Sequence, residues 1–239
     1  DTVLSRGLGD VYKRQPVATA IPAFIGYTQK HHLKNGDQVR YTPVRIQSLL
    51  EYEAIFGGAF HEQLSVKLED DLTTAPLPKV VVNEPEDGWS PFVLYYQLQM
   101  YFANGGGPCH IISVGLYYDG ETVNAISKED LGTGLKACEQ EDEVTLLLIP
   151  EAMALEDADR ADMYNAMLTQ CTRLQDRFAL FDVAVDPEGS VFDDGDYFRN
   201  KHVGNDNLKY GAAYYPALKS TLSYPVSYTH LTLPTSPKV

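Results

Sequence analysis

WSPFVLYYQLQMYFANGGGPCHIISVG, Trp89–Gly115, is the stretch that decides the fold of this chain. Ser90 suits a helix N-cap and Pro91 suits the first helical position, so a helix is predicted to begin there. Its residues Phe92–Phe102 leave almost no polar face, which indicates a helix covered on nearly all sides. The three glycines that follow end the helix, and Ile111–Val114 then begins a buried strand. The stretch therefore predicts a helix that leads directly into a core strand.

The same alternation of strands and helices extends along the chain on both sides of this stretch. Ala18–Tyr27 is a β-rich run that contains Pro22, so we expect an edge or bent strand. Ser48 and Glu51 form a capping box for a helix that stops at a pair of glycines. Further helices and strands are expected, in turn, at Glu129–Glu139, Val144–Ile149, Tyr164–Phe178, Ala179–Val185 and Ala212–Leu218. Continuous apolar strands alternating with helices predict an α/β fold, a mostly parallel sheet with helices on both faces.

One segment, about residues 60–88, departs from this alternation. Apolar residues alternate with polar ones from Leu64 to Leu68, and Thr73–Pro78 is a loop rich in proline and threonine. Lys79–Asn83 is a second strand. This pattern predicts an antiparallel hairpin inserted into the α/β domain.

The two ends of the chain differ from the rest. Residues 1–15 (DTVLSRGLGDVYKRQ) and 225–239 (PVSYTHLTLPTSPKV) resemble the translated linker sequence that recurs at the ends of fragmentary metagenomic reading frames. We expect these ends to be disordered and the chain to be an N-terminal and central fragment of a longer protein. The core domain is therefore expected to span residues 16–224, a suitable length for one α/β domain with an insertion.

The composition limits the partners of this domain. The 239-residue chain has a formal net charge of −14, which disfavours nucleic acid and anionic membrane surfaces as partners. No apolar run reaches the ~20 residues of a bilayer span. With 44% hydrophobic and 11% aromatic residues, the chain can bury a sizeable core.

The motifs for enzymatic chemistry do not fit. Gly105–Gly107 follows a helix and precedes a strand, whereas phosphate-binding glycines follow a strand and open a helix. Gly132–Lys136 (GTGLK) lacks the spacing of a phosphate-binding loop and falls within a predicted helix. No GxSxG motif is present. We therefore expect no catalytic site and no cofactor.

Metal binding is not expected either. Cys109, Cys138 and Cys171 lie in apolar segments, as buried reduced thiols do. No CxxC or HxxxH pair is present, and the histidines are scattered without an evident partner. The acidic run Asp186–Asp196 could bind calcium loosely, but it fails the EF-hand pattern.

Six segments, taken in order, resemble the sheath protein of contractile tails, as in tailed phages and related injection machines. They are AIPAFIGYT (Ala20–Thr28), PVRIQSLLEYEAIFGG (Pro43–Gly58), the opening stretch Trp89–Gly115, EDEVTLLLIPEA (Glu141–Ala152), QCTRLQDRFALFDV (Gln170–Val183) and LKYGAAYYPAL (Leu208–Leu218). No single segment is diagnostic, but the order of the six is specific. The resemblance covers most of residues 17–221.

The resemblance implies a mechanical role. Sheath subunits polymerise around an inner tube and contract to drive it through a target cell envelope. The implied partners are neighbouring sheath subunits, the inner tube protein, the baseplate and the tail terminator. The implied location is a virion tail or contractile particle assembled in the bacterial cytoplasm. The family's terminal arms, which mesh subunits by strand addition, would lie outside residues 16–224.

The first strand is the expected root of the N-terminal arm. The residues predicted to contact a partner are Val17, Thr19, Ile21, Phe24, Ile25 and Tyr27; an internal edge strand is an equally good interpretation. Two other functions remain open. One is a non-contracting baseplate or binding module built on the same core, and the other is an α/β enzyme with an unrecognised site.

Overall fold

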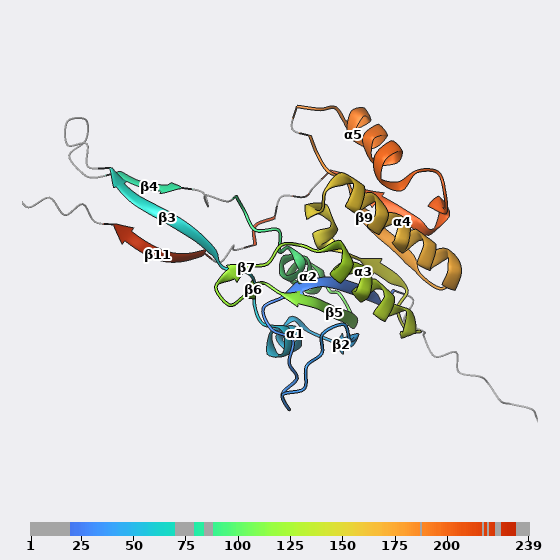
Figure 1. Cartoon of the computed structure of the whole chain (residues 1–239), viewed down its shortest axis with the longest axis horizontal. Helices are drawn as coiled ribbons and strands as arrows, with labels where there is room; N and C mark the ends of the chain where they lie inside the picture. The colour runs from blue at the N-terminus through green and yellow to red at the C-terminus, as the bar shows by residue number, and fades with distance from the viewer. Residues whose placement is uncertain are drawn as a thin grey trace, which may run out of the picture.

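A six-stranded sheet forms the centre of the protein (Figure 1). The computed structural model describes residues 20–69, 79–83, 88–186, 188–216, 218, 220–222 and 226–232. The strand order is β10-β9-β8-β1-β5-β2. The bounds are β1 Pro22–Thr28, β2 Val44–Ile46, β5 Cys109–Leu116, β8 Leu146–Leu148, β9 Phe178–Asp182 and β10 Gly211–Tyr214. Neighbouring strands are parallel except β2, which pairs antiparallel with β5. The prediction of a mostly parallel sheet is confirmed.

Helices cover both faces of this sheet. They are α1 Leu49–Phe56, α2 Leu94–Ala103, α3 Lys128–Ala137, α4 Asp157–Leu174 and α5 Val191–Tyr197. Short 3₁₀-helices lie at η1 Cys138–Gln140, η2 Pro150–Ala154 and η4 Leu208–Tyr210, and a π-helix lies at η3 Phe198–Val203. Alternate residues of β1 point to opposite faces: Ile25 packs in a core with α3 and α4, and Phe24 packs in a core with α1 and α2. The α/β fold with helices on both faces follows from this alternation.

The expectation of an edge position for the first strand is wrong, whereas a register shift between Gly26 and Tyr27 fits the alternative of a bent strand. β1 lies between β8 and β5, with Phe24 opposite Leu148 on one side and Ile111 on the other. Pro22 is compatible with a central position because it is the first residue of the strand, where the missing N–H disturbs the ladder least.

Local signals place the ends of α1 and α3 to within two residues, whereas α4 begins at Asp157 instead of Tyr164 and ends at Leu174, before Phe178 opens β9. The Ser48 side chain accepts from the Glu51 N–H, and Glu51 accepts from the N–H of Gln47, one residue before the expected position. The helix ends where Gly57 adopts a φ of 85°, a conformation that favours glycine. α2 begins at Leu94 rather than at Pro91, so its predicted start is wrong by three residues.

α2 is less covered than its sequence suggests. Leu94 and Leu98 are buried, whereas Tyr95, Met100 and Phe102 are only partly buried. The expectation of cover on nearly all sides is therefore wrong for a single chain. These three side chains therefore keep some accessible apolar surface in the described part of the chain.

The predicted hairpin is confirmed and projects away from the core (Figure 1). β3 Glu62–Glu69 pairs antiparallel with β4 Lys79–Asn83, and β11 Val226–Thr232 pairs parallel with the other edge of β3. A second small hairpin joins β6 Tyr118–Asp119 to β7 Thr122–Val123. The predicted loop Thr73–Pro78 lies outside the described residues.

β11 falls in the tail that we expected to be disordered. Its sequence, VSYTHLT, is rich in β-branched and aromatic residues, which favour strands, and β3 offers it an open edge. The expected disorder is thus replaced by strand pairing over residues 226–232. The resemblance of this segment to linker sequence remains a prediction, as does the whole of residues 1–15, which lie outside the described part of the chain.

No helix among the described residues is long and apolar enough to cross a bilayer.

Candidate functional site

The predicted partner-contacting residues of the first strand lie in the core. Ile21, Phe24, Ile25 and Tyr27 are each at most 6% exposed, and Val17 and Thr19 lie outside the described residues. A buried side chain has no surface to offer while β1 stays in the sheet. Partner contact through these residues remains untested in a single chain, and other surfaces are better placed for it.

The sheet has a topological switch point, the place where doubly wound proteins bind ligands. In chain order, β5 is added to the sheet on one side of β1, and β8, β9 and β10 are then added on the other side. In such sheets ligands bind beyond the carboxyl ends of the strands, at the point where the direction reverses. Here that point lies between β1 and β8.

Glu151 fills this position from within the chain. It follows β8 in η2 and is fully buried, and its Oε1 accepts the N–H of Leu94 at 3.1 Å. Val93, the N-cap residue of α2, gives that helix no side-chain cap, so a residue 57 positions away supplies one. Gly26 makes room for the carboxyl group, since a Cβ there would lie 2.1 Å from Oε2. The helix terminus that could hold an anionic ligand is already occupied.

The environment of Glu151 favours its neutral form. Burial raises its pKa to about 8, and the backbone N–H groups of Leu94, Val93 and Tyr27 oppose that rise. Near neutral pH the group is therefore largely protonated, and it ties together β1, η2 and the start of α2.

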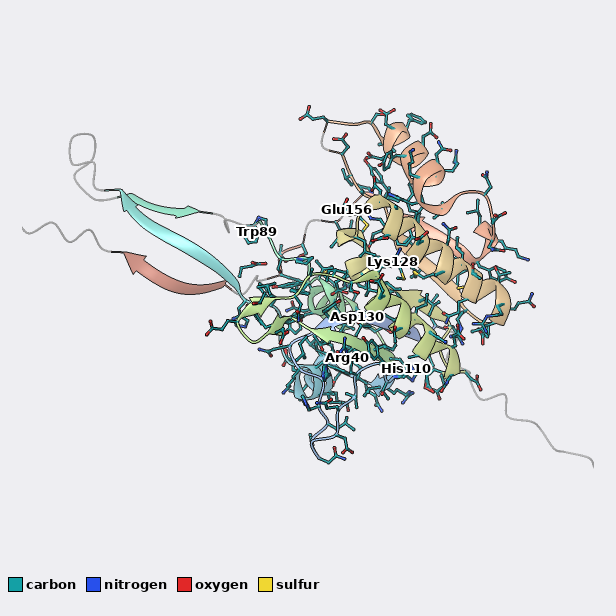
Figure 2. The ribbon with its side chains drawn as sticks, viewed as in Figure 1. Arg40, Trp89, His110, Lys128, Asp130 and Glu156 are labelled. Atoms are coloured by element: carbon teal, nitrogen blue, oxygen red, sulfur yellow. The ribbon has the colours of Figure 1, made fainter. Side chains whose placement is uncertain are left out.

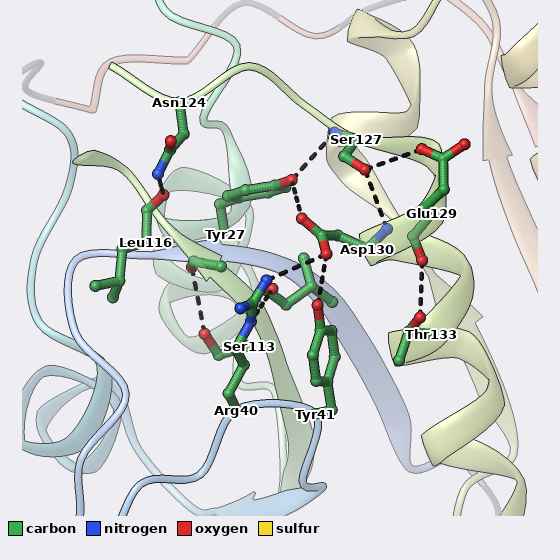
Figure 3. A network of polar contacts seen from close by, with 12 residues as sticks. Tyr27, Arg40, Tyr41, Ser113, Leu116, Asn124, Ser127, Glu129, Asp130 and Thr133 are labelled. Atoms are coloured by element: carbon green, nitrogen blue, oxygen red, sulfur yellow. Dashed lines mark hydrogen bonds and ion pairs between the residues drawn. The ribbon is translucent and has the colours of Figure 1, made fainter. Parts of the chain in front are cut away.

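A second polar cluster surrounds Asp130 at the carboxyl end of β1 (Figure 3). Its carboxylate accepts from the hydroxyls of Tyr27 at 3.2 Å and Tyr41 at 2.5 Å, and from Arg40 Nη2 at 3.1 Å. Arg40 Nε also donates to the carbonyl of Val114 at 2.7 Å. The cluster fastens the loop before β2 to β5 and to the first turn of α3.

The chemistry of this cluster suits fastening rather than catalysis. The pKa values of Tyr27 and Tyr41 are raised to about 12, chiefly by burial, so both phenols stay protonated and donate to Asp130. Arg40 and Asp130, both labelled in Figure 2, form an ion pair in which the two side chains are 43% and 30% exposed. Neither phenol is therefore activated as a nucleophile.

A small hollow lies at the carboxyl ends of β8, β9 and β10. It is lined by Gln97, Leu148, Ile149, Pro150, Tyr164, Leu180, Phe181, Asp182 and Tyr214. The Tyr164 hydroxyl donates to the Asp182 carbonyl at 3.1 Å, and burial raises its pKa. An acid and base in mutual contact would favour an enzyme, and these lining residues provide no such pair.

Two histidines have partners that the sequence did not reveal. His110 Nε2 lies 3.5 Å from Glu141 Oε2, and His202 Nε2 lies 3.3 Å from Asp157 Oδ1. Burial lowers the pKa of His110 despite the nearby Glu141. These partners are 31 and 45 residues distant along the chain, so spacing alone could not have found them.

The cysteines and acidic residues form no metal centre in the described part of the chain. The three predicted thiols are buried and free, and burial raises the pKa of Cys109 and Cys138 to about 12 and that of Cys171 to about 11. Asp193, from the acidic run that suggested calcium, caps α5 through Ser190. Its carboxylate already has a structural use.

Among solved structures, this chain has a remote neighbour in a prophage baseplate. The cryo-EM structure of the anti-feeding prophage (AFP) baseplate, 6-fold symmetrised, contains a chain that matches 83% of this chain at 20% sequence identity, with a TM-score of 0.45. The matched region covers 41% of that chain, so the present chain spans about two fifths of its length. No protein-family profile and no curated protein sequence matches this chain.

Proposed function

We propose that this chain belongs to a structural subunit of a contractile injection particle, and specifically to the tail sheath. The sheath would polymerise around an inner tube and contract to drive that tube through a target envelope. Its partners would be neighbouring sheath subunits, the tube, the baseplate and the tail terminator. The location would be a virion tail or similar particle, assembled in the bacterial cytoplasm.

One observation carries this proposal. Each of the six segments that resemble sheath proteins supplies one strand of the main sheet, in chain order β1, β2, β5, β8, β9 and β10. The β3–β4 hairpin and β11 lie outside those segments. The resemblance therefore follows the structural core rather than scattered surface motifs.

The burial of Glu151 at the switch point of the sheet supports a structural role. Glu151 occupies the helix terminus at which doubly wound proteins bind ligands. The outer side of α2 and the edges of the main sheet leave surface for contacts between subunits. These features favour a subunit of an assembly over an enzyme.

Ultracentrifugation tests the proposal. The reading frame that contains this chain would be recovered intact, and its product compared with the 239-residue chain. We expect the intact protein to pellet as a polymer and this chain to stay in the supernatant. An intact protein that stays soluble as a monomer or small closed oligomer would overturn the sheath assignment and favour a baseplate or binding module.

A further inference from the structure

The two ends of the main sheet differ in charge. The basic end is defined as the loop before β2 and the start of β2. This segment contains one acidic residue, Asp37, and four basic residues: Lys30, Lys34, Arg40 and Arg45. The acidic end is defined as the connection from β9 to β10, which includes α5. Six acidic and three basic residues lie there, between Val183 and Tyr210.

The strand order places these ends at opposite edges of the molecule. β2 is the last strand on one side and β10 the last on the other, and Figure 1 shows α5 and α1 far apart. α5 continues into η3, where the Phe198 ring packs near the Phe181 ring of β9. In the described part of the chain β2 pairs only with β5, and β10 pairs only with β9, so each end also has an open strand edge.

Both ends keep their charged groups accessible. Lys30 and Lys34 are exposed, and no ion pair within the described residues involves them. Glu188 and Asp196 are exposed at the acidic end. Arg40 and Arg45 pair with Asp130 and Glu143 within the chain, so the lysines carry most of the unpaired positive charge.

The acidic end also exposes apolar side chains. Phe192 is 85% exposed and Val191 is 63% exposed on α5, next to the acidic residues. An exposed aromatic side chain surrounded by polar groups is typical of a contact surface. The opposite end offers the long lysine stems against which such a ring can pack.

We infer that the acidic end of one copy docks on the basic end of a second copy of this chain. Charge complementarity selects this occupant, because a second copy of the chain carries the end of opposite charge. Two different surfaces meet in such a contact, so it is heterologous and repeats from copy to copy. This inference rests on the proposed function and specifies the contact between neighbouring subunits.

Charge reversal tests the contact in the 239-residue chain. Two variants are needed: Lys30→Glu with Lys34→Glu at the basic end, and Glu188→Lys with Asp196→Lys at the acidic end. Sedimentation velocity at low salt should show concentration-dependent self-association of the wild type, weakened at least about tenfold in either variant. High salt should weaken the wild-type contact as well.

Recombining the reversed ends provides the decisive result. A mixture of the two variants should associate, because each reversed end then meets a complementary one. A single chain with all four changes keeps the wild-type net charge of −14 and should also associate. Asp119→Lys with Glu121→Lys, on the β6–β7 hairpin, matches the acidic-end variant in charge and should leave association unchanged.

Three results would overturn the inference: a wild type that stays monomeric at low salt, reversed variants that associate as the wild type does, or a failure of recombination to restore association.

Phe192→Ser adds an independent check, since it should weaken association without changing the thermal unfolding of the monomer. If the charge-reversal test fails, the intact protein can still pellet as a polymer. The contact proposed here and the sheath assignment can therefore fail independently.

Discussion

At the scale of single residues, Glu151 links the stability of the fold to pH. Its pKa is raised from 4.5 to about 8 by burial. A carboxyl group with a raised folded-state pKa stabilises the fold fully below its unfolded pKa, and this contribution is lost as pH rises toward 8. Glu151→Gln keeps an oxygen for the Leu94 N–H but has no proton to lose.

We therefore predict that the wild type loses stability relative to Glu151→Gln between pH 5 and pH 8. The loss should be on the order of 2–4 kcal/mol, and urea unfolding at both pH values measures it. Glu121→Gln, at an exposed acid, serves as a control and should follow the wild type. Parallel pH profiles for the wild type and Glu151→Gln would show that Glu151 is not buried in this way.

Two glycines of α3, Gly132 and Gly134, differ in how much space each has for a side chain. A Cβ at Gly134 would lie 2.4 Å from Val114 Cγ1 and 2.8 Å from Ile25 Cγ2, whereas the nearest atom at Gly132 is 3.9 Å away. Gly132→Ala should stabilise the protein by about 0.5–1 kcal/mol, because alanine is the better helix former. Gly134→Ala should destabilise it by about 1–3 kcal/mol by forcing α3 off the sheet. Equal effects in thermal unfolding would contradict the close packing of α3 on β1 and β5.

At the scale of elements, the hairpin sheet should be separable from the core. β3 pairs only with β4 and β11 among the described strands, and Glu62 Oε1 accepts the Ser90 N–H at 2.7 Å, so the two ends of the insertion are adjacent. Replacing residues 63–87 by a short glycine-serine linker should leave one cooperative unfolding transition with little change in midpoint. Amide exchange at residues 226–232 should lose its protection, because β11 has lost its partner. Loss of cooperative unfolding would show that the hairpin is part of the core.

Elements were predictable from sequence where local signals decide them. Apolar strands, the Ser48 cap and the glycine stops are local signals, and they predict the α/β class, the inserted hairpin and the ends of α1. The place of β1 in the sheet depends on pairing with β5 and β8, which no local pattern encodes. The same reason explains the late start of α2, since its cap comes from Glu151, and the unforeseen Asp130 cluster.

At the scale of the whole molecule, the central claim is that this core repeats in a tubular polymer. Each of the six segments that resemble sheath proteins contributes one strand to the main sheet. The two ends of this sheet differ in charge, as a head-to-tail contact requires. The terminal arms implied by the resemblance would add strands to neighbouring copies. We expect the 239-residue chain to fold this core without forming long regular tubes by itself.

Negative-stain electron microscopy of the intact protein tests this claim most directly. The protein would be expressed from the recovered reading frame, purified without the other particle components and imaged. We predict hollow, striated tubes of uniform width. A monodisperse monomer or a small closed ring would contradict the account.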